Sequence, residues 1–531
     1  MRHSISLLVL FFTICSFGQK KFHVFPMDGK SIQGSPNGDG SLNNPWDLQT
    51  ALSQSSERVN GGDIIWLHSG TYNGRYTSTL KSTNSEFITV SAYKNDYVVL
   101  NGNVESKLKN VMEITGDKVI FKNFDVTSLG DFSRNVKDED FGRCAGINHL
   151  SGVAKFQNLK IYNNPGLGFG SWKSTGGSVI EDCIIFYNGY MGKNRGEGEG
   201  MYVQNKSDDT RIIMNNIIFG NYYKGVEVWS ASKGHDYEFV KNVNLVNNIF
   251  FNNGLPSGTL RDNVIIATND TRGINIAKHI KVLDNVFYQN IDFNDQKNYG
   301  NGVSLAIGFR AGAMLEDITI ENNIILGRNN GLNLMHVKSL NFKNNTVYSG
   351  YVNFHKSSLA VMESGNFNLE NNTYYTRNTT SHRVIDFKKM SLTDFTNKFH
   401  TDINSESKQF KDFQITPVLK VVELKTKKNY FNVALLQKEG KDVTVDFSEF
   451  NIEEGSSYKI YDIENRNVVA KSGKISNDMK IKFPMGLKAF EKPTYNTIAT
   501  KTSSNFGVFR VEFEEQKKKS TLFSRLFGWL F

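Results

Sequence analysis

A short apolar strand, an Asn-rich turn and a second apolar strand recur along the chain. Nine units carry this pattern, from VIFKNFDV and AKFQNLKIYNN to LNFKNNTVYSG and FNLENNTYY. The polar turn position is assigned to Asn123, Asn158, Asp182, Asn216, Asn248, Asn285, Asn323, Asn345 and Asn372, with successive spacings of 35, 24, 34, 32, 37, 38, 22 and 27 residues. Alternation of period two requires strands, and a coil of strands tolerates loops of variable length where helical repeats do not. The pattern predicts an all-β, right-handed parallel β-helix.

A further strand precedes each of the later units and opens with glycine or a polar residue. Its openers are Gly146, Gly168, Gly200, Gly225, Asn263, Gly302 and Gly331. The first and third residues after each opener are mostly apolar and should point into the coil, so the second and fourth should face outward. Stacked Asn side chains can also pair from one coil to the next, which explains the polar turn position.

The ends of the chain differ from the repeat. Residues 1–18 have a polar start, an apolar run and small residues before Gln19, which predicts a signal peptide and an exported, periplasmic or secreted protein. A lipoprotein signal through Cys15 is the alternative. The β-helix is expected over residues 19–410, with the segment NNPWDLQTALSQS as a helix that caps its first coil. A β-sandwich-like antiparallel domain is expected over 411–516, and a basic amphipathic tail over 517–531, where peripheral membrane contact is the alternative to a packed end.

Charge and composition narrow the class of partner. Hydrophobic residues make up 39% of the chain and charged residues 22%, which is typical of globular proteins. The net charge is +9, of which the tail holds +4 and the signal segment +1. A mildly basic exported body suits an anionic partner such as a uronate or sulfated glycan, although ordinary surface charge would look the same. We expect no nucleic-acid partner. Cys144 and Cys183 are expected as unpaired core thiols, with a disulfide between them as the alternative.

The outward positions of neighbouring coils carry aromatic, amide and carboxylate groups. We expect a glycan-binding face formed by Trp172, Gln204, Glu227 and Trp229 around Tyr202, because a flat ring covers the apolar face of a sugar. The alternative is that a long loop covers these side chains. Charged loops between the strands add Arg195, Glu197, Glu199, His235, Arg261, Arg272 and Arg310. Insertions on one side of a solenoid often build its site.

The opening segment GSPNGDGSLNNPWDLQTAL, the following GDIIWLHSGTY and the Asn-turn units resemble secreted bacterial β-helix proteins such as pectate, alginate and chondroitin lyases. The resemblance spans roughly residues 22–375. It implies β-elimination, by a lyase or a dehydratase, on acidic and marine algal glycans such as ulvan, with an unsaturated uronate as the product. In such lyases a Lys, Arg, His or Tyr removes the proton at carbon 5, and arginine or calcium neutralises the carboxylate.

Carried over to this chain, the resemblance implies that Tyr202 or His235 transfers the proton, and that Arg195, Arg272 and Arg310 bind the carboxylate. Calcium stays open as a cofactor, because Asp138, Glu139, Asp140 and the pair Asp208 and Asp209 supply oxygen atoms but lack EF-hand spacing. No other metal site is expected. Two alternatives stand beside elimination: a glycoside hydrolase that pairs Glu197 or Glu199 with Glu227, and a glycan-binding protein without catalysis.

Overall fold

The computed structural model describes residues 18–295, 302–495 and 498–514. The predicted signal peptide therefore falls almost entirely outside the described residues, as does the predicted tail. Both stay predictions. Among the residues that the structure describes, none of the helices is long and apolar enough to cross a membrane.

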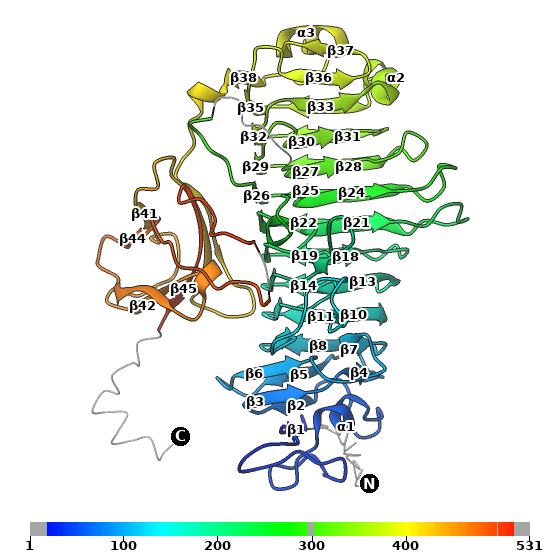
Figure 1. Cartoon of the computed structure of the whole chain (residues 1–531), viewed down its shortest axis with the longest axis vertical. Coiled ribbons are helices and arrows are strands. Elements are labelled where there is room, and N and C mark those ends of the chain that lie inside the picture. The colour runs from blue at the N-terminus through cyan, green and yellow to red at the C-terminus, as the bar shows by residue number, and fades with distance from the viewer. Residues whose placement is uncertain (1–17, 296–301, 496–497, 515–531) are drawn as a thin grey trace, which may run out of the picture.

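Three twelve-stranded sheets, A, B and C, run the length of the molecule (Figure 1), and their strands pair in parallel throughout except for the last pair of sheet C. Sheet A contains β1 (Lys21–Val24), β2 (Ile64–Leu67), β5 (Ile88–Ala92), β8 (Val119–Lys122), β11 (Ala154–Gln157), β14 (Val179–Glu181), β19 (Arg211–Met214), β22 (Val240–Val246), β25 (Ala277–Leu283), β28 (Glu316–Glu321), β31 (Leu340–Lys343) and β34 (Phe367–Glu370). Sheet B contains β3 (Gly70–Asn73), β6 (Val98–Asn101), β9 (Asp125–Thr127), β12 (Lys160–Tyr162), β15 (Ile184–Phe186), β20 (Ile217–Phe219), β23 (Ile249–Phe251), β26 (Val286–Tyr288), β29 (Ile324–Leu326), β32 (Thr346–Tyr348), β35 (Thr373–Thr376) and β38 (Glu406–Gln409).

Sheet C contains β4 (Tyr76–Ser78), β7 (Asn110–Ile114), β10 (Ala145–Ser151), β13 (Phe169–Ser174), β18 (Met201–Val203), β21 (Val226–Ser230), β24 (Val264–Thr268), β27 (Leu305–Ile307), β30 (Leu332–Leu334), β33 (Val352–His355), β36 (His382–Ile385) and the antiparallel β37 (Lys388–Met390). From β2 to β36 the chain visits sheets A, B and C in turn, so that each of these coils adds one strand to every sheet. This is the parallel β-helix that the repeat predicts.

The Asn-rich turn joins sheet A to sheet B and consists of two adjacent columns. The first column has left-handed backbone with φ between 50° and 65°, a conformation that asparagine and aspartate adopt more readily than other side chains; it contains Asn123, Asn158, Asp182, Asn215, Asn247, Asp284, Asn322, Asn344 and Asn371. The second column is buried and contains Asn216, Asn248, Asn285, Asn323, Asn345 and Asn372. Each of these amides from Asn216 to Asn345 donates to the next at 3.0–3.1 Å.

The sequence alignment of the turn was therefore wrong by one residue in its later members. Its first three members belong to the left-handed column, and its last six belong to the buried column. The structural equivalent of Asp182 is Asn215, because Glu181 pairs with Met214. The two columns merge in the sequence because consecutive Asn residues fill both positions in most coils.

A second buried ladder joins sheet B to sheet C and explains the opening glycines. It contains Asn164, Asn188, Asn221, Asn253 and Asn263, each amide nitrogen donating to the next carbonyl oxygen at 2.9–3.1 Å. A Cβ at Gly225 would lie 2.7 Å from Asn253 Nδ2, and one at Gly200 equally close to Asn221 Nδ2. Glycine is required there because the ladder leaves no room for a side chain.

Both ends of the coil are closed. At the first coil, α1 (Leu48–Leu52) is N-capped by Asp47 and buries Leu48, Ala51 and Leu52. This is the helix that the sequence predicts as the cap of the first coil. At the last coils lie α2 (Leu359–Glu363) and α3 (Leu392–Phe399). The short 3₁₀ segments are η1 (Leu255–Ser257), η2 (Lys356–Ser358), η3 (Phe410–Asp412) and η4 (Ile463–Asn465).

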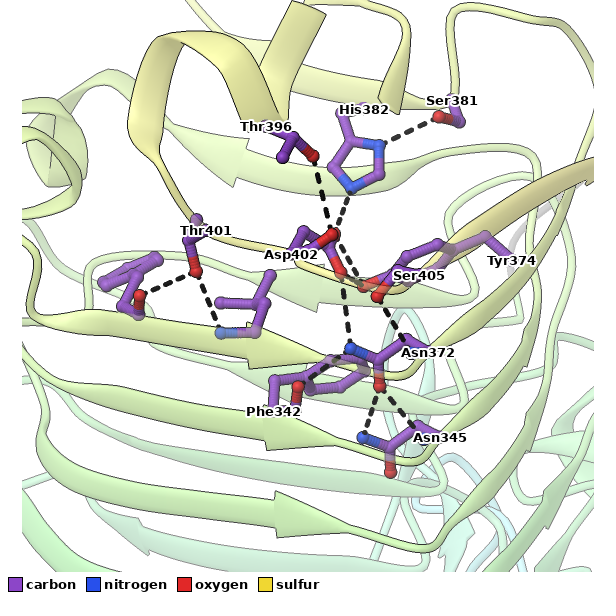
Figure 2. Close-up of polar contacts among 12 residues, drawn as sticks. Phe342, Asn345, Asn372, Tyr374, Ser381, His382, Thr396, Thr401, Asp402 and Ser405 are labelled. Carbon is purple, nitrogen blue, oxygen red and sulfur yellow. Dashed lines mark hydrogen bonds and ion pairs between the residues drawn. The ribbon is translucent and has the colours of Figure 1, made fainter. Parts of the chain in front are cut away.

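The asparagine ladder of the A-to-B turn ends in a polar cluster beneath α3 (Figure 2). Asp402 accepts from Tyr374 Oη at 2.9 Å and from Asn372 Nδ2 at 3.4 Å, and its Oδ2 lies 2.9 Å from His382 Nε2. Ser381 Oγ lies 2.9 Å from His382 Nδ1. A serine, a histidine and an aspartate are thus aligned, but all three are buried and closed to substrate. The cluster provides hydrogen-bond partners for the end of the ladder.

The C-terminal segment forms an antiparallel sheet in the order β39 (Val418–Glu423), β40 (Tyr430–Leu436), β45 (Phe506–Phe513), β42 (Ser457–Asp462) and β43 (Val469–Lys474), beside the pair β41 (Val443–Asp446) and β44 (Lys480–Phe483). It lies against sheet B (Figure 1). Phe506 stacks on Tyr288 at 4.1 Å between ring centroids, and Arg466 lies 4.1 Å from the ring centre of Tyr162. The C-terminal segment therefore covers the middle coils of sheet B. The outer face of sheet C is flanked instead by the loops between the strands.

Candidate active site

The outer face of sheet C carries one continuous row of outward-facing positions. Parallel register aligns Asn148 with Gly170, Gly170 with Tyr202, and Tyr202 with Glu227. The residues that precede Tyr202 and Glu227 on their strands, Met201 and Val226, are buried in the coil, as the period-two pattern predicts. The coil near residue 302 differs from the sequence expectation: Leu305 pairs with Val264, so Ser304 stands at the opening position and Ala306 faces outward.

Aromatic rings form a platform at one end of this row. The Trp172 indole donates to Asn148 Oδ1, and its ring lies 5.3 Å from the ring of Tyr202, measured between centroids. A Cβ at Gly170 would lie 3.0 Å from Trp172 Nε1, so the missing side chain lets the indole lie close over the strand. Two further predicted residues adjoin it, since Gln204 Nε2 donates to the carbonyl oxygen of Trp229 at 3.3 Å. The platform suits the apolar face of a sugar ring.

An acidic and basic ladder runs along the B-to-C edge of the same face. Glu199, Lys224 and Asp262 each precede an opening residue in successive coils, and the amides of Gly200 and Gly225 donate to the carbonyls of Lys224 and Asp262. Lys224 Nζ lies 2.6 Å from Glu227 Oε1 and 3.7 Å from Asp262 Oδ2. One ammonium group thus sits between two carboxylates, with Glu199 in the neighbouring coil.

The charges in this cluster perturb one another. Burial, and then the negative charge of Glu227, raise the pKa of Glu199 from 4.5 to about 7. Burial also raises the pKa of Asp262, although Lys224 opposes it. Burial by itself would lower the pKa of Lys224, but the attraction of Glu227 and Asp262 raises it overall. Burial raises the pKa of Tyr202 to about 12. The site therefore holds a carboxyl group that is substantially protonated at neutral pH beside a lysine that stays charged.

Guanidinium groups surround the cluster on aromatic supports. Arg195 lies in the hairpin of β16 (Tyr190–Met191) and β17 (Gly196–Glu197), donates to the Tyr223 hydroxyl and lies 4.2 Å from the centre of that ring. Arg261 also lies near Tyr223, and Arg143 lies 5.8 Å from the ring centre of Tyr190. These three guanidiniums take part in none of the ion pairs found among the described residues. Their charge is available to an anion.

The remaining predicted residues lie in loops at the opposite, C-to-A edge of sheet C. Arg272 is ion-paired with Asp236 at 2.9 Å, and Arg310 Nε donates to Asn269 Oδ1 at 2.8 Å. His235 is exposed, with its ring 4.9 Å from the ring of Phe239. The structure thus brings Arg195, Tyr202, Glu227, Trp172, Gln204 and Trp229 to one cluster, and places His235, Arg272 and Arg310 apart from the carboxylates.

Sequence reasoning missed Lys224 and Asp262 as site residues. Both occupy the residue directly before an opening Gly or Asn, and that position carries Glu199 in the preceding coil. Opposite charges at one repeat position in successive coils were the available signal. Their alternation, acid then base then acid, becomes meaningful only when the coils are stacked in register.

Most of the acidic groups considered for calcium have protein partners. Asp138 and Asp140 accept hydrogen bonds from the side chain and the backbone of Ser133, and Asp208 is ion-paired with Lys241 at 2.7 Å. Within the described part of the chain, no group of three or more His, Cys, Asp or Glu side chains is arranged to hold a metal ion. Cys144 and Cys183 are both free and buried, as expected.

No protein-family model matches the chain, and no curated protein matches it either. Solved structures that resemble it include the pectate lyase Pel9A, at 16% identity and a TM-score of 0.39 over 70% of this chain and 79% of that one. An alginate lyase from Paenibacillus sp. matches at 16% identity and 0.33, over 65% of this chain and 94% of that one. The GH136 lacto-N-biosidase from Eubacterium ramulus matches at 10% identity and 0.43, over 73% and 67%. At these identities the similarity concerns the fold alone.

Proposed function

We propose that the protein is a carbohydrate-active enzyme that acts on an acidic glycan by β-elimination at a uronate residue. The observation that carries this proposal is the combination, on one face of sheet C, of a protonatable Glu199 with guanidiniums that lack carboxylate partners. An acid–base pair serves proton transfer, and bidentate arginine suits a carboxylate. The aromatic platform of Trp172 and Tyr202 adds a surface for the sugar ring.

In this proposal the guanidiniums of Arg143 and Arg195 bind the uronate carboxylate and stabilise the charge that develops when the C5–H bond breaks. The electron pair of that bond forms the C4–C5 double bond, and the bond from C4 to its oxygen breaks. Protonated Glu199 supplies the proton to the leaving oxygen. If that oxygen belongs to the next sugar the enzyme is a lyase, and if it leaves as water the enzyme is a dehydratase.

The proton acceptor must be unprotonated at the working pH. Burial raises the pKa of Tyr202 to about 12, which keeps its hydroxyl protonated near neutrality. Glu227 is the second carboxyl group of the cluster, and its Oε1 lies 2.6 Å from Lys224 Nζ. We therefore assign the base to Glu227 and keep Tyr202 as a hydrogen-bonding group for the sugar. His235, the other residue expected for this step, lies at the far edge of the sheet.

Hydrolysis is the second candidate, because Glu199, whose pKa is raised, and Glu227 form the kind of carboxyl pair that glycoside hydrolases use. The guanidiniums favour elimination, since hydrolysis of a neutral glycan does not need them. Export through the predicted signal peptide, with an extracellular or periplasmic glycan as substrate, is part of the same proposal.

Product analysis tests the proposal. The protein is incubated with pectate, alginate, chondroitin and ulvan, and with their oligomers, while ultraviolet absorbance reports unsaturated uronate and mass spectrometry reports product size. Unsaturation with chain scission indicates a lyase, and loss of one water without scission indicates a dehydratase. Saturated fragments would replace elimination by hydrolysis. Tight binding without any product would leave a glycan-binding protein.

A further inference from the structure

The outward row of sheet C continues beyond the proposed active site to the last coils. Pairwise register carries it from Glu227 through Ile265, Ala306, Asn333 and Asn353 to Arg383. Five strand spacings of about 4.8 Å place Arg383 roughly 24 Å along the coil from Glu227. A glycan would have to span this distance to contact both the active site and the end of the row.

Two cations face each other at that end. Arg383 on β36 and Lys389 on β37 are direct cross-strand partners in an antiparallel pair. Both lie over the ring of Tyr351, at 5.2 Å and 5.0 Å from its centre. Like charges directly opposite each other destabilise such a pair. The acid in the adjoining turn, Asp386, is engaged by His355 and Lys356 instead.

Polar atoms without protein partners adjoin the cations. Asn353 is fully buried, and its Nδ2 donates to Asn333 Oδ1 at 2.8 Å, but its Oδ1 has no hydrogen-bond partner within the described residues. Arg383 Nη2 donates to Asn330 Oδ1 at 3.2 Å, whereas its Nε is buried and unpartnered there. A buried polar atom left unpaired costs about 1–3 kcal/mol. The guanidinium and the ammonium group suit an oxyanion.

A cavity of about 450 Å³ lies along the same strands and is lined by Arg383, Val384, Ile385, Asp386, Phe387, Lys388 and Lys389. This volume is within the range of small-molecule sites. A sugar in this cavity that carries a carboxylate or sulfate meets both Arg383 and Lys389, which line it.

We propose that Arg383 and Lys389, on the Tyr351 ring, form a second subsite that binds an oxyanion-bearing sugar of the same glycan chain, away from the reacting bond. The subsite rests on the proposed function in one respect, that the substrate is an acidic glycan. It makes affinity depend on chain length, because only long chains reach both the reacting bond and the subsite. Carboxylate and sulfate present the same chemistry to it.

The test measures binding to long polygalacturonate, to dextran sulfate and to neutral dextran, by affinity electrophoresis and calorimetry. The proteins are the Glu199→Gln protein as the slowly reacting parent, the same protein with Arg383→Gln and Lys389→Gln, and a matched control with Lys411→Gln. Lys411 is an exposed lysine of η3, beyond the last strand of sheet B, and does not line the cavity. We expect the double change to weaken binding of at least one anionic polymer about tenfold or more, because it removes two charge-assisted contacts. The control and neutral dextran should show no change.

Loss with polygalacturonate alone identifies a carboxylate, loss with dextran sulfate alone a sulfate, and loss with both a general oxyanion. Equal affinity in parent and double variant, or an equal loss in the Lys411 control, would overturn the subsite. Lys389→Gln by itself serves if the double variant does not fold, since Lys389 is exposed on the last strand. Binding is measured without turnover. If the double variant loses affinity although no glycan gives a product, the subsite stands and the proposed reaction fails.

Discussion

Replacement of Glu199 by glutamine should lower activity and at the same time raise stability at alkaline pH. Glutamine keeps the shape of the protonated carboxyl group but can neither donate the proton for catalysis nor ionise. The pKa of Glu199 is raised because burial and the charge of Glu227 oppose its ionisation. Removal of this ionisation removes a destabilising charge from the folded state.

The magnitude follows from the pKa. A change from 4.5 to about 7 corresponds to about 3 kcal/mol, at about 1.4 kcal/mol for each pKa unit. The Glu199 carboxyl group binds its proton more tightly in the folded protein than in the unfolded chain. Its contribution to the free energy of unfolding is therefore fully present below about pH 4.5 and is lost as pH rises through about 7. At pH 8 the Glu199→Gln protein should therefore exceed the native protein by up to about 3 kcal/mol, and at pH 4 by little. Loss of a general acid lowers kcat by about 10²- to 10⁴-fold.

Urea unfolding at pH 4, 6 and 8 measures the stability difference, and initial rates of unsaturated-product formation measure kcat. Activity of the native protein should fall as pH rises through about 7, because Glu199 loses its proton. Glu197→Gln is the matched control: Glu197 ends β17 two residues before Glu199, accepts from the Tyr190 hydroxyl at 2.9 Å, and should keep most of the activity. Unchanged kcat in Glu199→Gln, or a stability gain at pH 8 no larger than that at pH 4, would refute the assignment.

Three further changes test the fold and the site. Asn285→Leu should lower the free energy of unfolding by about 2–5 kcal/mol in urea titrations, because the buried backbone amide of Asn248 loses its acceptor, whereas Asn368→Leu on the exposed face should cost less than about 1 kcal/mol; equal losses would contradict the ladder. Trp172→Ala should raise KM about tenfold or more with a smaller change in kcat, and an unchanged KM would remove the platform from the binding site. Lys224→Met should lower kcat at least about 10²-fold, since the base loses its charge partner, and should move the alkaline fall of activity to higher pH, since Lys224 holds down the raised pKa of Glu199; a native pH profile would argue against that role.

The sequence predicts the coil and the side of each strand because both depend on local chemistry. Period-two alternation sets which side chains enter the core, and left-handed turns select Asn or Asp. The outward placement of residues such as Tyr202 and Glu227 therefore follows from the alternation alone. The alignment slipped by one residue at Asn216 because adjacent asparagines satisfy either column, and only strand pairing distinguishes them.

The composition of the site could be predicted only in part, because it depends on the edge of the sheet at which each loop leaves. Arg195 and Arg272 look alike in sequence, both in charged loops between strands. Arg195 leaves from the B-to-C edge and joins the carboxylates, whereas Arg272 leaves from the C-to-A edge and pairs with Asp236. Lys224 required the stacking of coils, which local pattern does not specify.

A crystal structure of the Glu199→Gln protein with a bound uronate oligosaccharide tests most directly whether the outer face of sheet C is the active site. We expect one sugar ring on Trp172 and Tyr202, its carboxylate at Arg143 or Arg195, and a bond between sugars within hydrogen-bonding reach of residue 199. An oligosaccharide that instead occupies sheet A, or the C-to-A loops around Arg272, would contradict this location of the site.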